Sequence, residues 1–144
     1  MGTVRVELDL NAHPDRVWQV IGSFAAGPQQ MAPGFVTDCI VEGQVRTVFF
    51  ADGSVSQERL VAVEENERRM VYAIVGGSLE PDHDNATMQV LSGEDSTCTL
   101  TWIHDVLPDT LAGQLHAVMR EASPIIKAAL EASPTLERDH CDEN

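Results

Sequence analysis

Residues 45–77, VRTVFFADGSVSQERLVAVEENERRMVYAIVGG, predict three consecutive strands. Apolar and polar residues alternate through much of this stretch, and β-branched residues are frequent, as is typical of strands. The Asp-Gly pair at residues 52–53 is typical of a tight hairpin turn, and the charged run at residues 64–68 marks a second turn. The stretch therefore predicts the middle of a sheet built from neighbouring strands.

The strand at residues 54–63, SVSQERLVAV, carries one charge on each of its two faces. Because successive side chains of a strand point to opposite sides, Glu58 and Arg59 cannot both face the core. Each face is mostly apolar towards its end, so alternation alone leaves open which charge points inward.

The remaining chain predicts a strand, two short helices, further strands and a long C-terminal helix. Residues 3–10 alternate as a first strand, and Pro14 suits the first turn of the helix at 11–24, whereas residues 25–34 allow only one short helical turn. Further strands are expected at 35–43, 85–93 and 96–106, and the long helix at 107–134. The apolar stripe expected on that helix consists of Leu111, Leu115, Val118, Ala122, Ile125, Ile126 and Ala129.

This order of elements predicts an α+β protein in which a seven-stranded antiparallel sheet wraps around one long C-terminal helix. A twisted sheet and a single helix touch along a line, so the gap beside that line is a natural pocket. We expect residues 1–133 to form one domain and residues 134–144 to form a charged, frayed tail.

The composition limits the partners. The net charge of −14 disfavours nucleic acid and anionic lipid surfaces. No apolar run approaches a membrane span of about 18 residues, and the N-terminus lacks a signal-peptide pattern, so we expect a cytoplasmic protein. Three cysteines without CxxC spacing are expected to be reduced thiols, and no cofactor motif is present. The sequence is compatible with a homodimer but selects no interface.

The sequence resembles the helix-grip proteins of the START-like superfamily, also called SRPBCC, which includes polyketide cyclases, birch-pollen-type allergens and plant abscisic-acid receptors. The resemblance spans residues 3 to 131. It is carried by PDRVWQVIGSF at the first helix, by the quoted stretch at 45–77, and by TLTWIHDV in the last strand. The ERL strand, its charged turn and the Tyr-containing strand that ends in Gly-Gly are the most specific of these features.

The resemblance implies that Glu58 faces an internal cavity and that Arg59 faces solvent. It also implies an apolar cavity lining drawn from several strands and from the terminal helix. The residues expected to contact a ligand are Thr37, Val48, Phe50, Ser56, Glu58, Leu60, Tyr72, Ile74, Asp84, Ala86, Met88, Leu100, Trp102, His104, Leu115, Val118 and Ala122.

Two departures from the family affect the expected ligand. Thr37 stands where the plant receptors carry a cavity lysine, and Asp84 stands where the family often has an aromatic residue. With Glu58 and Asp84 in the cavity and no evident cation, the sequence disfavours an anionic ligand and predicts a neutral or weakly cationic one.

Glu58, His104 and Tyr72 are the candidate catalytic residues. An apolar environment disfavours the charged form of Glu58 and would suit it to acid–base chemistry, and an imidazole such as His104 titrates near neutrality. Each also has a plain structural interpretation, Glu58 as a satisfied cavity carboxyl group and His104 as a residue at the rim. His83, Asp84 and His104 have the chemistry of metal ligands but not the spacing, so no metal site is expected.

We therefore expect a carrier or sensor that binds a small, largely apolar ligand, of lipid or polyketide type, in the internal cavity. The alternative is a cyclase or dehydratase that uses Glu58 or His104 to remove a proton next to a carbonyl group. A protein-interaction module that uses a sheet edge or the terminal helix is a third class.

Overall fold

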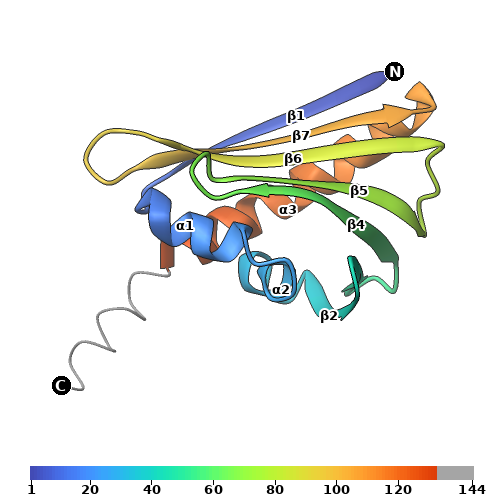
Figure 1. Cartoon of the computed structure of the whole chain (residues 1–144), viewed down its shortest axis with the longest axis horizontal. Helices are drawn as coiled ribbons and strands as arrows, with labels where there is room; N and C mark the ends of the chain where they lie inside the picture. The colour runs from blue at the N-terminus through green and yellow to red at the C-terminus, as the bar shows by residue number, and fades with distance from the viewer. Residues whose placement is uncertain (133–144) are drawn as a thin grey trace.

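A computed structural model describes residues 1–132 of the chain, so the tail expected at 134–144 lies outside the described residues. The predicted helix-grip α+β fold is confirmed: strands and two short helices precede one long helix (Figure 1). The elements are β1 (Gly2–Leu10), α1 (Pro14–Ile21), α2 (Gly27–Met31), β2 (Val36–Glu42), β3 (Val45–Phe50), β4 (Val55–Glu64), β5 (Arg69–Gly77), β6 (His83–Ser92), β7 (Cys98–Leu107), the 3₁₀ turn η1 (Asp109–Leu111) and α3 (Ala112–Ala132).

The strands form one seven-stranded antiparallel sheet in the order β1-β7-β6-β5-β4-β3-β2. Consecutive strands from β2 to β7 are neighbours, and β1 pairs with β7 to form one edge of the sheet. Figure 1 shows the sheet curving over α3, with α1 and α2 below β4. This curvature gives the sheet a concave face on which the helices pack.

Helix α1 begins where the sequence predicts. Pro14 occupies the first turn, and the Nδ1 atom of His13 accepts a hydrogen bond from the backbone N–H of Asp15. The indole N–H of Trp18 donates to Glu65 at 2.7 Å, which connects α1 to the turn between β4 and β5. Trp18 therefore packs in the core while its polar atom has a partner.

The buried stripe of α3 differs from the predicted one. Val118 was expected in the stripe but is 42% exposed, whereas Met119 is 1% exposed. The side chains that α3 buries are Leu115, Met119, Ala122, Ile126 and Leu130. The buried row is shifted by about one position from the predicted one. Steps of three and four residues fit both the row that contains Val118 and the row that contains Met119, and only packing against the sheet selects between them.

The end of β1 is tied to the last turns of α3. Glu131 accepts hydrogen bonds from the backbone N–H of Asn11 at 2.8 Å and from Lys127 at 2.9 Å. Lys127 also donates to the carbonyl oxygen of Asp9. The C-terminal half of the helix is thereby held against the strand at the start of the chain.

Within residues 1–132, no helix combines the length and apolarity needed to cross a membrane.

Candidate functional site: an internal cavity with two polar clusters

A cavity of about 390 Å³ lies between the concave face of the sheet and helices α2 and α3. Apolar side chains make up most of its wall. Of the residues expected to contact a ligand, the wall contains Val48, Phe50, Ser56, Glu58, Tyr72, Ile74, Met88, Trp102, His104, Leu115, Val118 and Ala122.

The structure places Glu58 and Arg59 on opposite sides of β4. Glu58 is 7% exposed and lines the cavity, whereas Arg59 is exposed to solvent. Irregular pairing with β5 at two points of β4 adjusts the strand to the curved sheet. Of the two charges on this strand, the carboxylate of Glu58 is therefore the one that points inward, which alternation alone left open.

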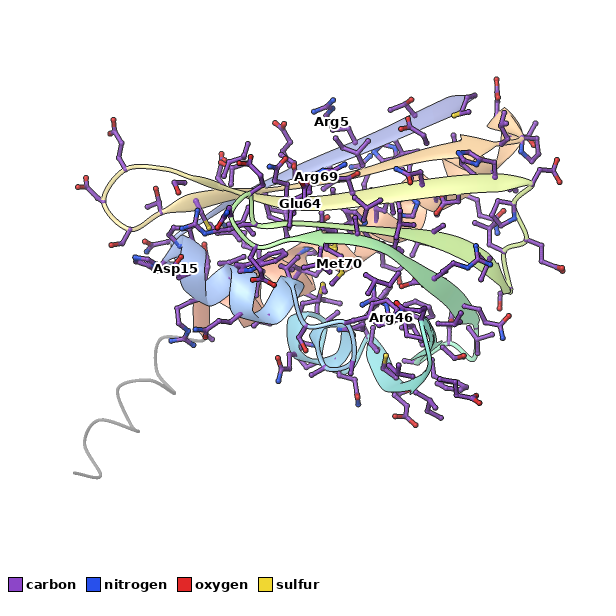
Figure 2. All side chains as sticks on the ribbon, viewed as in Figure 1. Arg5, Asp15, Arg46, Glu64, Arg69 and Met70 are labelled. Carbon is purple, nitrogen blue, oxygen red and sulfur yellow. The ribbon has the colours of Figure 1, made fainter. Side chains whose placement is uncertain are left out.

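Arg46 on β3 pairs directly with Glu58, its register partner on β4. The Nε atom of Arg46 lies 2.8 Å from Oε1 of Glu58, and the arginine side chain is only 3% exposed. Nη1 donates to the carbonyl oxygen of Phe24 at 3.0 Å, and the guanidinium carbon lies 4.7 Å from the ring centroid of Phe24 and 5.0 Å from that of Tyr72. Figure 2 shows Arg46 under the curved sheet, towards α2.

The expectation that the cavity contains no cation is therefore wrong. Arg46 shares a strand face with Val48 and Phe50, both of which were expected to face inward, so simple alternation could have found it. It was missed because arginine is rarely buried without a partner, and its partner lies on another strand.

Both carboxylate oxygens of Glu58 are used within the protein. Oε1 receives the bond from Arg46, and the hydroxyl of Ser56 donates to Oε2 at 2.9 Å. A carboxylate held in this way is a poor candidate for a free base, because taking up a proton would break a charge-assisted contact.

A second polar cluster consists of Asp84, His104, Tyr72 and Trp102. Nδ1 of His104 lies 2.8 Å from Oδ1 of Asp84, and Nε2 of His104 lies 3.5 Å from the Tyr72 hydroxyl. The indole N–H of Trp102 donates to the same hydroxyl at 3.1 Å. The pKa of Tyr72 is raised well above its usual range, chiefly because burial disfavours the phenolate, and the negative charge of Glu58 adds to the effect.

Asp84 is placed by an interruption of the sheet. The ladder between β5 and β6 ends at the Tyr72–Ala86 pair, and the next N–H of β5 on that side, at Ile74, donates to Oδ2 of Asp84 at 2.9 Å. The side chain of Asp84 thus replaces a backbone acceptor and also fixes the ring of His104. Its position was singled out in the sequence as a departure from the family, but its partner was not predicted.

Five of the expected contact residues lie outside the cavity wall: Thr37, Leu60, Asp84, Ala86 and Leu100. Thr37 is exposed, and its hydroxyl donates to the carbonyl oxygen of Phe49. Ala86 and Leu100 are fully buried in the main core, against which Leu60 also packs. Asp84 lies behind His104. Residues on the inward face of a curved sheet belong either to the packed core or to the cavity wall, and the sequence does not show which of the two each residue joins.

The residues that sequence reasoning did not assign to the wall include a group from α2 and the segment after it. These are Pro28, Met31, Ala32, Phe35 and Val36. Their apolar character is visible in the sequence, but their place beside α3 depends on how the short helix folds back over the sheet. Met119 and Ile126 complete the wall from α3.

A curved sheet that grips one helix beside a cavity defines the helix-grip class. The family described as "Polyketide cyclase / dehydrase and lipid transport" matches residues 1–133, and the chain belongs to this family. None of the curated proteins matches the sequence.

Solved structures share the fold. The protein XoxI from Bacillus cereus is 22% identical with a TM-score of 0.81, over 93% of this chain and 99% of its own. An uncharacterised protein from Bacillus thuringiensis is 20% identical with a TM-score of 0.78, over 90% of this chain and 98% of its own. A Thermobifida fusca protein is 24% identical with a TM-score of 0.72, over 91% of each chain.

Proposed function

We propose that this protein binds a small, largely apolar ligand in its internal cavity, as a carrier or sensor of lipid-like or polyketide-like molecules. The observation that carries the proposal is the cavity of about 390 Å³, whose wall is mainly apolar and includes a few buried polar groups. A volume in the range of roughly 300–1,000 Å³ with few convergent polar groups is typical of small-molecule sites.

Blocking the cavity tests this function. Ala122 is buried in the cavity wall on α3, and Ala128 is exposed on the same helix, so Ala122→Phe and Ala128→Phe are matched substitutions. After extraction of co-purified lipid, the neutral dye Nile red should bind the wild type and Ala128→Phe with enhanced fluorescence. Ala122→Phe should lose at least about tenfold in affinity while circular dichroism shows a folded protein. Equal dye binding by both variants would contradict cavity binding.

The second polar cluster supports a second candidate, an enzyme that moves protons next to a carbonyl group. Asp84 would hold the Nδ1–H tautomer of His104, and Nε2 would accept a proton from the carbon beside the carbonyl once the substrate oxygen had drawn the Tyr72 hydroxyl away from it. Tyr72, whose burial keeps the phenol protonated, would donate a hydrogen bond to the enolate oxygen. Glu58 is a weaker candidate for the base because Arg46 and Ser56 already engage it.

Isotope exchange distinguishes the enzyme from a carrier. In deuterated buffer, an enzyme should exchange the protons beside the carbonyl of methyl octyl ketone, followed by proton NMR. The variant His104→Gln should bind the ketone but lose the enzyme-dependent exchange. Binding by the wild type without any exchange above buffer would leave the carrier function and exclude this catalytic one.

A further inference from the structure

We propose that Glu58 makes the cavity selective for uncharged ligands, because it occupies the charge of Arg46 that a ligand carboxylate would otherwise use. Arg46 instead offers its remaining N–H donors to a neutral acceptor oxygen, such as that of a ketone or ester. This inference rests on the proposed ligand-binding function and specifies the class of ligand.

The hydrogen bonds of Arg46 carry the first step. Its Nε donates to Glu58 and its Nη1 donates to the carbonyl oxygen of Phe24, whereas Nη2 has no hydrogen-bond partner among residues 1–132. The side chain is almost completely enclosed and belongs to the cavity wall. The guanidinium carbon lies over the rings of both Phe24 and Tyr72, so Nη2 is the part of the guanidinium left to a ligand.

The surrounding charges carry the second step. Among the described residues of the wall, Arg46 is the permanent cation and Glu58 is the buried acid, whereas the acidic side chains of Asp52 and Glu121 are exposed to solvent. The imidazole of His104 is already paired with the carboxylate of Asp84. An anionic ligand would therefore find the charge of Arg46 already neutralised and would have to compete with Glu58, which is fixed 2.8 Å from the guanidinium.

A neutral oxygen avoids this conflict. It needs donors but no counter-charge, and the free N–H groups of a buried guanidinium give a charge-assisted hydrogen bond. The apolar remainder of the ligand would contact the aliphatic walls supplied by β5 and α3. Glu58 thus acts by excluding one class of ligand, which is a common means of specificity.

The test compares two probes of similar length, decanoate and methyl octyl ketone, by isothermal titration calorimetry. The wild type should bind the ketone at least about tenfold more tightly than decanoate. Glu58→Gln retains an oxygen acceptor for Arg46 but removes the negative charge, so it should gain at least about tenfold in decanoate affinity.

The matched control is Glu64→Gln. Glu64 lies on the same strand but is exposed and pairs with Arg69 on β5, and both residues are labelled in Figure 2. It removes the same charge from the whole protein without changing the cavity, and should bind both probes as the wild type does. If Glu64→Gln gained decanoate binding to the same extent as Glu58→Gln, net charge would be the cause and the proposal would be wrong.

A double variant, Arg46→Met with Glu58→Met, covers the case in which Glu58→Gln does not fold. With both charges removed, decanoate should gain no affinity, because its partner has been removed along with its competitor. Equal binding of the two probes by the wild type would overturn the selectivity and leave cavity binding intact. Binding of neither probe by any folded form would instead refute the ligand-binding function itself.

Discussion

At the residue scale, the cavity is defined by side chains that each hold a partner on another strand. Arg46 and Glu58 join β3 to β4, and Asp84 and His104 join β6 to β7. A buried ion pair such as Arg46–Glu58 contributes little net stability, because desolvation offsets most of its attraction. The position of this pair in the wall of the cavity supports its proposed role in ligand recognition.

Tyr72 is the only tyrosine of the chain, so its ionisation can be followed alone by ultraviolet absorbance. Burial raises its pKa above the usual value near 10, so the folded protein should show no phenolate at a pH where an exposed tyrosine ionises. The stabilisation from the neutral phenol is complete below about pH 10 and is lost as the pH rises further, because only the unfolded state then releases the proton.

The expected result is a single absorbance change that coincides with alkaline unfolding measured by circular dichroism. A phenolate signal that appears near pH 10 in a still folded protein would show that Tyr72 is accessible to solvent.

Sequence reasoning identified the inward carboxylate Glu58 only through the resemblance to a family, since alternation alone left it unassigned. The cation opposite it, Arg46, shares the alternation of Val48 and Phe50, but the sequence analysis expected no cation in the cavity. The partnership of Asp84 with His104 could not be predicted, because it depends on where the ladder between β5 and β6 ends. Pairings across strands require a register that periodicity does not supply.

At the element scale, the order and types of the strands and helices followed from hydrophobic periodicity. The face of α3 did not, because two rows of apolar residues run along the helix and differ by about one position. Met119 occupies the row that packs against the sheet, and Val118 occupies the row beside it. The difference has a measurable energetic consequence.

Met119→Ala should lower the free energy of unfolding by about 2–5 kcal/mol, because it removes a fully buried side chain. The neighbouring Val118→Ala should cost less than about 1 kcal/mol, since Val118 is 42% exposed. Urea unfolding of both variants, with unchanged m values, measures the difference. Equal losses in the free energy of unfolding for the two variants would contradict the assignment of Met119, rather than Val118, to the row that packs against the sheet.

At the scale of the whole molecule, β1 runs along α3 and contacts it near both ends, since Met1 pairs with Asp109 beside the start of the helix and Asn11 meets Glu131 near its end. The last residues of β1 lie against the last turns of α3, where Glu131 accepts from Asn11 and Lys127. The helix is therefore fixed to the sheet at the end away from η1, and the cavity lies between these two attachments.

Glu131→Gln should lower the melting temperature slightly at neutral pH, by the equivalent of less than about 1 kcal/mol. The hydrogen bond from Asn11 and the contact with Lys127 lower the pKa of Glu131. Its contribution is therefore present above the unfolded pKa and is lost as the pH falls through the folded value. The difference between wild type and variant should shrink as the pH is lowered below about 4, measured by thermal melts.

Glu80→Gln, which changes an exposed acid in the loop between β5 and β6, is the control and should leave the melting temperature unchanged at both pH values. A constant difference between wild type and Glu131→Gln across the pH range would mean that the ionised carboxylate has no special role at this junction.

The acceptor that Asp84 offers to the N–H of Ile74 has a consequence for the motion of the cavity wall. Beyond the Tyr72–Ala86 pair, the hydrogen bond from Ile74 to the side chain of Asp84 joins β5 to β6. A rotamer change of this one aspartate is therefore enough to break that hydrogen bond. Amide hydrogen exchange at Ile74 then reports on a local parting of the wall, whereas exchange at Tyr72 reports on the ladder itself. A ligand that tightens the Asp84–His104 pair would slow exchange at Ile74 and leave exchange at Tyr72 unchanged, so the Ile74 amide would report whether the cavity is occupied.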